Sequence, residues 1–122
     1  MNSVRLRKLL VLDFMCAFMG AVIYFAAYYF LTETLFMPAG LVRAQAAANC
    51  LYGIFGLFIF ATRKEGLFKI LIMMNFAYAG LCLMLAIVLL WKELQWGALI
   101  LLLEGLLIFS LAWFELKASA EN

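Results

Sequence analysis

The stretch GALILLLEGLLIF, residues 97–109, contains a single polar side chain, Glu104. A run this apolar is typical of a helix that crosses a lipid bilayer, because ~20 apolar residues are needed to span ~30 Å of hydrocarbon. Glu104 then falls near the bilayer centre, where a charged side chain costs roughly 2.5–3.5 kcal/mol on insertion scales. We therefore expect its carboxyl group to face protein or trapped water.

The composition of the whole chain indicates the same solvent. Of its 122 residues, 70% are hydrophobic and 13% are charged, whereas a soluble domain carries about 25% charge. A soluble fold of this composition would expose large apolar patches, so we expect lipid to surround it. The net charge of +2 is too small to indicate a nucleic-acid partner.

Four segments are long and apolar enough to cross a membrane: about 9–31, 39–61, 67–91 and 95–114. Each is expected to be helical, because lipid offers no partners for backbone N–H and C=O groups. The connections are short, so consecutive helices should pack antiparallel. The sequence predicts an all-α membrane protein in which residues 1–122 form a single domain, with four transmembrane helices in an antiparallel up-down bundle.

Lys and Arg are unevenly distributed between the two sides of this bundle. One side, with both termini and the middle connection, carries Arg5, Arg7, Lys8, Arg63, Lys64, Lys69 and Lys117. The other side carries only Arg43 and Lys92. Cytoplasmic loops have an excess of Lys and Arg, so we expect both termini in the cytoplasm and the protein in the plasma (inner) membrane.

A short pattern recurs in the second and third spans. Asn49 and Tyr52 in the second span match Asn75 and Tyr78 in the third, and a small residue follows each pair. Three residues of helix return to nearly the same face. In a straight hairpin, Asn49 would lie level with Tyr78, and Tyr52 level with Asn75. Two amide–phenol hydrogen bonds, each worth about 0.6 kcal/mol, would then join these helices, with small residues on both allowing a close approach.

Glu104 lies at a similar depth on the fourth span, so its expected partners are the same two Asn and two Tyr residues. In one interpretation, a protonated Glu104 donates to one of them and locks the bundle. In another, its carboxyl group binds a cation or carries a proton. A third places it in a contact between subunits. The predicted binding site comprises Glu104, Asn49, Asn75, Tyr52 and Tyr78.

Two further charged residues lie near the ends of spans. Asp13 is about one turn inside the cytoplasmic end, and we expect a local charge pair with Arg7 or Lys8, with a gate residue as the alternative. Arg43 lies early in the second span, where it can reach the interface or pair with Glu33.

Several kinds of chemistry find no support in the sequence. The chain has no His, which removes the commonest metal ligand and general base. Cys16, Cys50 and Cys82 lie in apolar runs and form no C-x-x-C pair. Paired carboxylates on one helix face and a phosphate-binding glycine loop are also missing. We therefore predict no catalytic residue, no metal, no cofactor and no enzymatic activity.

Three functions stay open at this point. The favoured one is transport of a small cation or polar solute by an oligomer, through the Glu/Asn/Tyr layer in the middle of the membrane. The first alternative is a non-catalytic accessory or assembly subunit of a larger membrane complex. The second is a binder of a lipid, a quinone or another hydrophobic molecule. The lipid bilayer is the expected partner in all three cases.

Overall fold

A computed structural model of the chain describes residues 4–120. Its α-helices are α1 (Val4–Ala26), α2 (Ala39–Thr62), α3 (Glu65–Trp91) and α4 (Gln95–Ala120). A π-helical turn, η1 (Phe30–Thr34), follows α1. The shortest of the four helices has 23 residues and is about 35 Å long at 1.5 Å per residue, enough to cross the hydrocarbon core. The predicted all-α bundle with four spans is confirmed.

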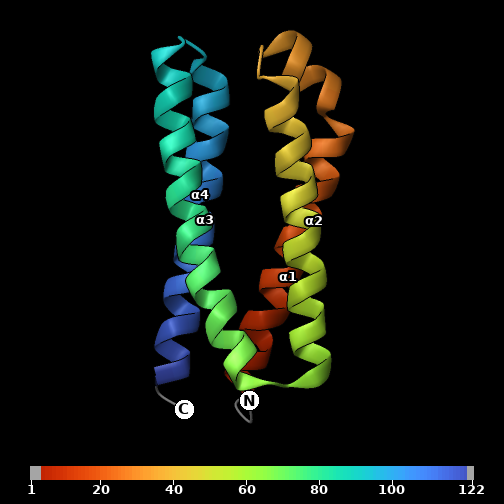
Figure 1. The fold of residues 1–122 in the computed structure, drawn as a ribbon, viewed down its shortest axis with the longest axis vertical. Coiled ribbons are helices and arrows are strands. Elements are labelled where there is room, and N and C mark those ends of the chain that lie inside the picture. Colours follow the sequence, from red (N-terminus) through yellow and green to blue (C-terminus); the bar gives the residue numbers. More distant parts are fainter. Residues whose placement is uncertain (1–3, 121–122) are drawn as a thin grey trace.

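The helices are arranged as two hairpins (Figure 1). α1 packs along α2 and α3 packs along α4, whereas contacts between the two hairpins are much sparser. Both chain ends and the α2–α3 turn lie at one end of the bundle, which we call the terminal end. The α1–α2 and α3–α4 connections lie at the other end, which we call the hairpin end.

Glycines determine which helices approach closely. A Cβ atom added to Gly53 would lie 2.8 Å from the ring of Phe18, and one added to Gly56 would lie 2.8 Å from the Cβ of Phe14. In the second hairpin, a Cβ atom on Gly105 would lie 3.2 Å from the backbone of α3. The prediction that small residues bring α2 and α3 together is wrong, because these surfaces are occupied by α1 and α4.

Corresponding positions along the helices are buried in the two hairpins. All five buried residues of α1 have a buried counterpart in α3 at a constant spacing along the chain. The pairs are Leu6 with Phe68, Leu10 with Ile72, Asp13 with Asn75, Ala17 with Ala79, and Tyr24 with Ala86. Five of the six buried α2 positions recur in α4 in the same way, from Val42 with Ala98 to Ile59 with Glu115. The bundle is therefore built from two similar hairpins.

The helix ends differ most from the predicted spans in α1 and α4. α1 begins at Val4 and ends at Ala26, so it lies closer to the terminus than the predicted span 9–31. α4 continues past the predicted end at residue 114 to Ala120. Charged side chains can continue a helix beyond its apolar stretch when their tips reach water or a partner, so hydropathy alone places these ends too early or too late.

The interior consists of two apolar clusters with polar groups between them. One cluster is at the hairpin end and contains Tyr24, Leu31, Met37, Val42, Ala86, Leu89, Ala98 and Leu101. The other is at the terminal end and contains Leu6, Leu10, Ile59, Phe68, Leu71, Ile72 and Ala118. The buried polar side chains Asp13, Gln45, Asn49, Asn75 and Glu115 belong to neither.

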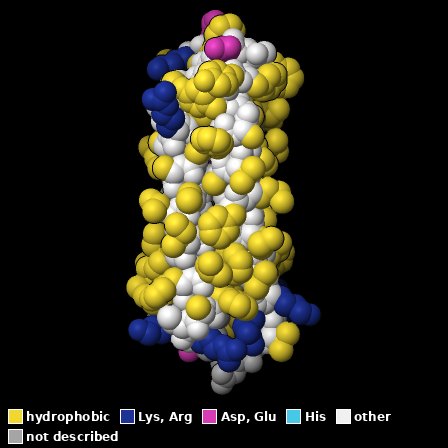
Figure 2. Space-filling view, turned by 90° about the vertical axis from the view of Figure 1, so that its right-hand side faces the viewer, with side chains coloured by type: hydrophobic (Ala, Val, Ile, Leu, Met, Phe, Trp, Pro, Cys, Tyr) yellow, Lys and Arg dark blue, Asp and Glu magenta, His cyan; other side chains and the backbone are white. Residues whose placement is uncertain are grey.

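The outer surface is apolar along most of its length. Figure 2 shows hydrophobic side chains over the middle of the bundle, with Lys and Arg gathered toward its two ends. Large residues such as Phe25, Met73 and Leu103 are exposed on this surface. Such a belt needs lipid as its solvent, and the chain is an integral membrane protein.

Candidate functional site

Glu104 on α4 is surrounded by hydrogen-bond donors from the first hairpin. The Tyr24 hydroxyl of α1 donates to its Oε1 atom at 2.8 Å. From α2, Gln45 Nε2 donates to Oε1 at 3.2 Å and Asn49 Nδ2 donates to Oε2 at 3.0 Å. The Cys82 thiol of α3 lies 3.7 Å from Oε1. All four helices therefore meet at one carboxyl group.

These contacts define the chemical role of Glu104. A side-chain amide nitrogen can only donate a hydrogen bond, and each oxygen of Glu104 accepts from one such nitrogen. Both oxygens therefore act as acceptors toward these amides. The same contacts leave open whether the Tyr24 hydroxyl donates to a carboxylate or accepts from a protonated Glu104.

Gln45 links Glu104 to α3. Its Oε1 atom accepts a hydrogen bond from the Tyr78 hydroxyl, and its Nε2 atom donates to Glu104. The side chain is buried, and because it is an amide it transmits the contact from phenol to carboxylate. Gln45 is not among the residues of the predicted site. Its spacing of one helical turn from Asn49 is the signal that could have revealed it.

The predicted amide–phenol pairs between α2 and α3 are wrong in their partners. Asn49 donates to Glu104 and not to Tyr78, while Tyr78 donates to Gln45. The Tyr52 hydroxyl donates to the backbone oxygen of Met74 at 3.1 Å rather than to an Asn75 atom. The Tyr52 and Tyr78 rings are in edge contact, with their centroids 5.1 Å apart. The expected depth is nearly right, but the Asn side chains turn toward carboxyl groups.

A second cluster of polar side chains contains Asp13 of α1, Asn75 of α3 and Glu115 of α4. Asn75 Nδ2 donates to Asp13 Oδ2 at 2.8 Å and to Glu115 Oε1 at 3.4 Å. The expected charge pair of Asp13 with Arg7 or Lys8 is wrong: Asp13 points into the bundle, and the Arg7 guanidinium lies over the Phe60 ring at 5.2 Å.

Glu115 was not predicted as a site residue. The fourth span was expected to end at residue 114, which would have left Glu115 in the interface. In the structure, α4 continues to Ala120 and Glu115 is fully buried. Its burial depends on Asp13 and Asn75 facing it from two other helices, and no local pattern reports that arrangement.

A small cavity between the helices is lined by Glu104 and also by Asp13 and Asn75 of the second polar cluster. Its volume is about 60 Å³, and side chains of all four helices line it. All five predicted site residues are on its wall, as is Asp13. The full lining is Asp13, Cys16, Ala17, Gly20, Asn49, Tyr52, Asn75, Tyr78, Glu104, Leu107, Ile108 and Leu111. All of these lining residues belong to one chain.

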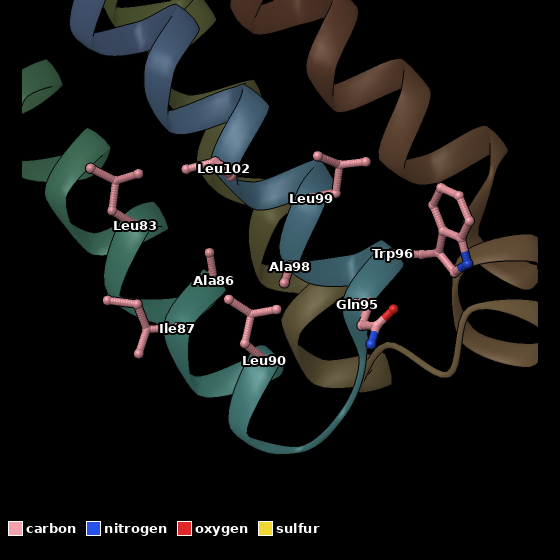
Figure 3. A pocket seen from close by; sticks show the side chains of 9 residues that line it. All are labelled: Leu83, Ala86, Ile87, Leu90, Gln95, Trp96, Ala98, Leu99 and Leu102. Atoms are coloured by element: carbon pink, nitrogen blue, oxygen red, sulfur yellow. The ribbon is translucent and has the colours of Figure 1, made fainter.

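A much larger hollow lies elsewhere and has a different character. It is an open furrow of about 670 Å³ along α3 and α4 near the hairpin end (Figure 3). Its wall is almost entirely aliphatic, with Gln95 and Trp96 at one side. Among the residues that line this furrow, only Gln95 and Trp96 have a polar side-chain atom.

The partner of Arg43 differs from the one that the sequence predicted. Its guanidinium lies over the Tyr28 ring at 5.4 Å, which is a cation–π geometry. Pairing with Glu33 was one of the predicted alternatives.

The chain matches no family model, and no curated protein or solved structure shows significant similarity to it.

Proposed function

We propose that this protein transports a small cation across the membrane through the interior of its own bundle. The observation that carries this proposal is the central cavity, in which the only charged side chains on the wall are the carboxyl groups of Asp13 and Glu104. Ionisable side chains inside a membrane protein are costly and commonly mark ion or proton pathways.

The charge of the cavity wall favours a cation. Glu104 is held as an acceptor by amide, phenol and thiol donors, and none of these donors carries a positive charge. Dipoles satisfy the oxygens without cancelling the net charge. In a low-dielectric interior such a charge attracts a counter-ion strongly, so a cation is the natural guest.

The size of the cavity narrows the class of solute. A water molecule occupies about 30 Å³ of liquid volume, so 60 Å³ corresponds to about two waters. A proton carried on water or a single alkali-metal ion can be accommodated, whereas an organic solute is too large. The proposal is therefore narrower than the small cation or polar solute expected from the sequence.

The arrangement of the hairpins supports alternating access. Apolar clusters lie between the polar region and each end of the bundle, so passage requires a movement. Each hairpin is tightly packed within itself, and contacts between hairpins are sparse. Transporters built from two repeats often work by rocking one repeat against the other around a site at their interface.

The positions of Lys and Arg give a direction to the path. With Lys and Arg more abundant at the terminal end, we place both termini in the cytoplasm of a plasma-membrane protein. Asp13 and Glu115 then face the cytoplasmic half, and Glu104 with Tyr24 faces the outer half.

Purified protein in liposomes tests the proposal. A pH-sensitive dye inside the vesicles reports proton movement, driven by a potassium diffusion potential or by gradients of Na⁺, K⁺ or Li⁺. We expect wild-type protein to change the internal pH faster than protein-free liposomes do under at least one of these conditions. Glu104→Gln, which keeps the shape of the side chain and removes its charge, should lower that rate at least about tenfold, or 1.4 kcal/mol of barrier.

Two further variants make the result interpretable. Glu93→Gln removes a carboxyl group in the α3–α4 connection and should transport like wild type. Glu104→Asp keeps the carboxylate and should retain partial flux, so it replaces Glu104→Gln if the latter does not give folded, monodisperse protein. No flux of any tested cation above that of protein-free liposomes would overturn the proposal, as would unchanged flux in folded Glu104→Gln.

A further inference from the structure

The cluster of Asp13, Asn75 and Glu115 has too few hydrogen-bond donors for its acceptors. The three side chains are 8%, 4% and 0% exposed. One amide group, Asn75 Nδ2, donates to both carboxyl groups, at 2.8 Å to Asp13 Oδ2 and 3.4 Å to Glu115 Oε1. The other oxygen of Glu115, Oε2, is buried and has no donor among the described residues. Glu104 does not share this shortage of hydrogen-bond donors, because each of its oxygens has a donor.

The two carboxyl groups also lie within hydrogen-bonding reach of each other. Two carboxylates at this separation repel strongly when both are ionised, and such pairs generally hold one proton between them. A proton on either group would convert an acceptor into a donor. It would satisfy the buried oxygen and remove the repulsion in one step.

Within residues 4–120, the groups found to act on Asp13 and Glu115 include no Lys or Arg. Cys16 of α1 and Tyr52 of α2 interact electrostatically with Asp13. From α3 the contact is the neutral amide of Asn75, and from α4 it is Glu115 itself. None of these groups is a base, so the charge of the pair must be reduced by something that binds to it.

The geometry favours a proton over a metal ion as that ligand. A hard cation is bound by oxygen atoms, but Asn75 presents its nitrogen to both carboxyl groups. Within residues 4–120, no group of three or more His, Cys, Asp or Glu side chains is placed to hold a metal. Asp13 lines the central cavity and Glu115 lies outside its wall, so exchange with the cavity takes place through Asp13.

We infer that Asp13 and Glu115 form a proton-binding site in which the two carboxyl groups share one proton, with Asn75 holding both in place. This inference rests on the proposed transport function and names the proton as the ligand on the cytoplasmic side of the cavity. The equivalent positions of Asp13 and Asn75 in the two hairpins place the site where the hairpins meet. Movement of one hairpin against the other would therefore open or close it.

Infrared spectroscopy of the purified protein at neutral pH tests the site directly. A protonated carboxylic acid has a C=O stretching band that is absent from a carboxylate and that shifts on exchange into D₂O. We expect one such band in wild type and its loss in both Asp13→Asn and Glu115→Gln, because the new amide supplies the missing donor and the remaining carboxyl group ionises. Glu93→Gln should keep the band, and so should Glu104→Gln, because each oxygen of Glu104 already has an amide donor and needs no shared proton.

Several outcomes would overturn the inference. One is a wild-type spectrum without the band, and another is a band that persists in either folded single variant. Loss of the band on addition of Na⁺ or Ca²⁺ at constant pH would identify a metal-ion site instead. The double variant Asp13→Asn/Glu115→Gln has no charge to repel and should fold even if a single variant does not; a band remaining in it would place the proton elsewhere.

The spectrum and the flux assay fail independently. If folded Glu104→Gln loses cation flux but Glu115→Gln keeps the acid band, the transport proposal survives and the shared proton does not. If the band behaves as expected and no cation crosses the membrane, the proton-binding site survives and the transport proposal fails.

Discussion

Glu104 and Glu115 are two glutamates on the same helix, about three helical turns apart, in opposite hydrogen-bonding surroundings. Glu104 receives hydrogen bonds from a phenol and two amides, one amide to each of its oxygens. Glu115 faces a second carboxyl group and shares one amide with it. The deeper burial of Glu115 does not explain this difference. The number of donors that other helices supply decides whether a buried carboxyl group can stay charged.

The same Glu→Gln substitution at both residues tests this difference most strongly. In Glu104→Gln, an NH₂ group replaces one of the two accepting oxygens and would face other hydrogen-bond donors, which come from Tyr24, Gln45 and Asn49. We therefore expect the free energy of unfolding to fall by about 3 kcal/mol. In Glu115→Gln, the new nitrogen can donate to Asp13, and we expect a value within about 1 kcal/mol of wild type, or above it. Reversible unfolding by SDS in mixed micelles measures both.

Equal losses in the two variants would remove the distinction between the sites. Glu93→Gln is the matched control, because it makes the same chemical change in the α3–α4 connection.

The packing that supports the Asp13 side of the comparison can be tested at Gly56. In Gly56→Ala, the added methyl group would meet the Cβ of Phe14 at 2.8 Å and push α1 away from α2 beside Asp13. We expect a loss of about 1–2 kcal/mol of unfolding free energy. Gly80→Ala is the control, since nothing lies within 4 Å of the added atom, and it should be neutral or stabilising by up to about 1 kcal/mol. Similar values for both would show that α1 is not held at this contact.

The smallest expected effect sharpens the account of Glu104. Tyr24→Phe removes one donor and leaves the two amide donors in place. Hydrogen bonds between membrane helices are worth about 0.6 kcal/mol on average, and we expect a loss of that size in the same unfolding assay. Tyr29→Phe, at an exposed tyrosine, should show no change. A loss as large as that of Glu104→Gln would mean that Tyr24, rather than the amides, stabilises the carboxylate.

The structure brings the predicted residues together around one cavity, and the reason also explains which residues the prediction missed. Glu104, Asn49 and Asn75 interrupt long apolar runs, and each of them lines the cavity. Gln45 and Glu115 are near the ends of apolar runs, where polar residues are ordinary, and both are buried in the site. Polar side chains close to a predicted span end are therefore the ones that hydropathy underestimates.

Local composition was enough to indicate lipid as the solvent, to locate four spans and to place Glu104 inside the fourth of them. Each of these depends only on how many apolar residues follow one another. Only the tertiary structure decided which helices pair and which donors reach each carboxyl group. A soluble helix reveals its inward face through an apolar stripe, but helices in lipid are apolar on all sides. The choice of partner then depends on close packing at glycines such as Gly53 and Gly56, which only the assembled bundle shows.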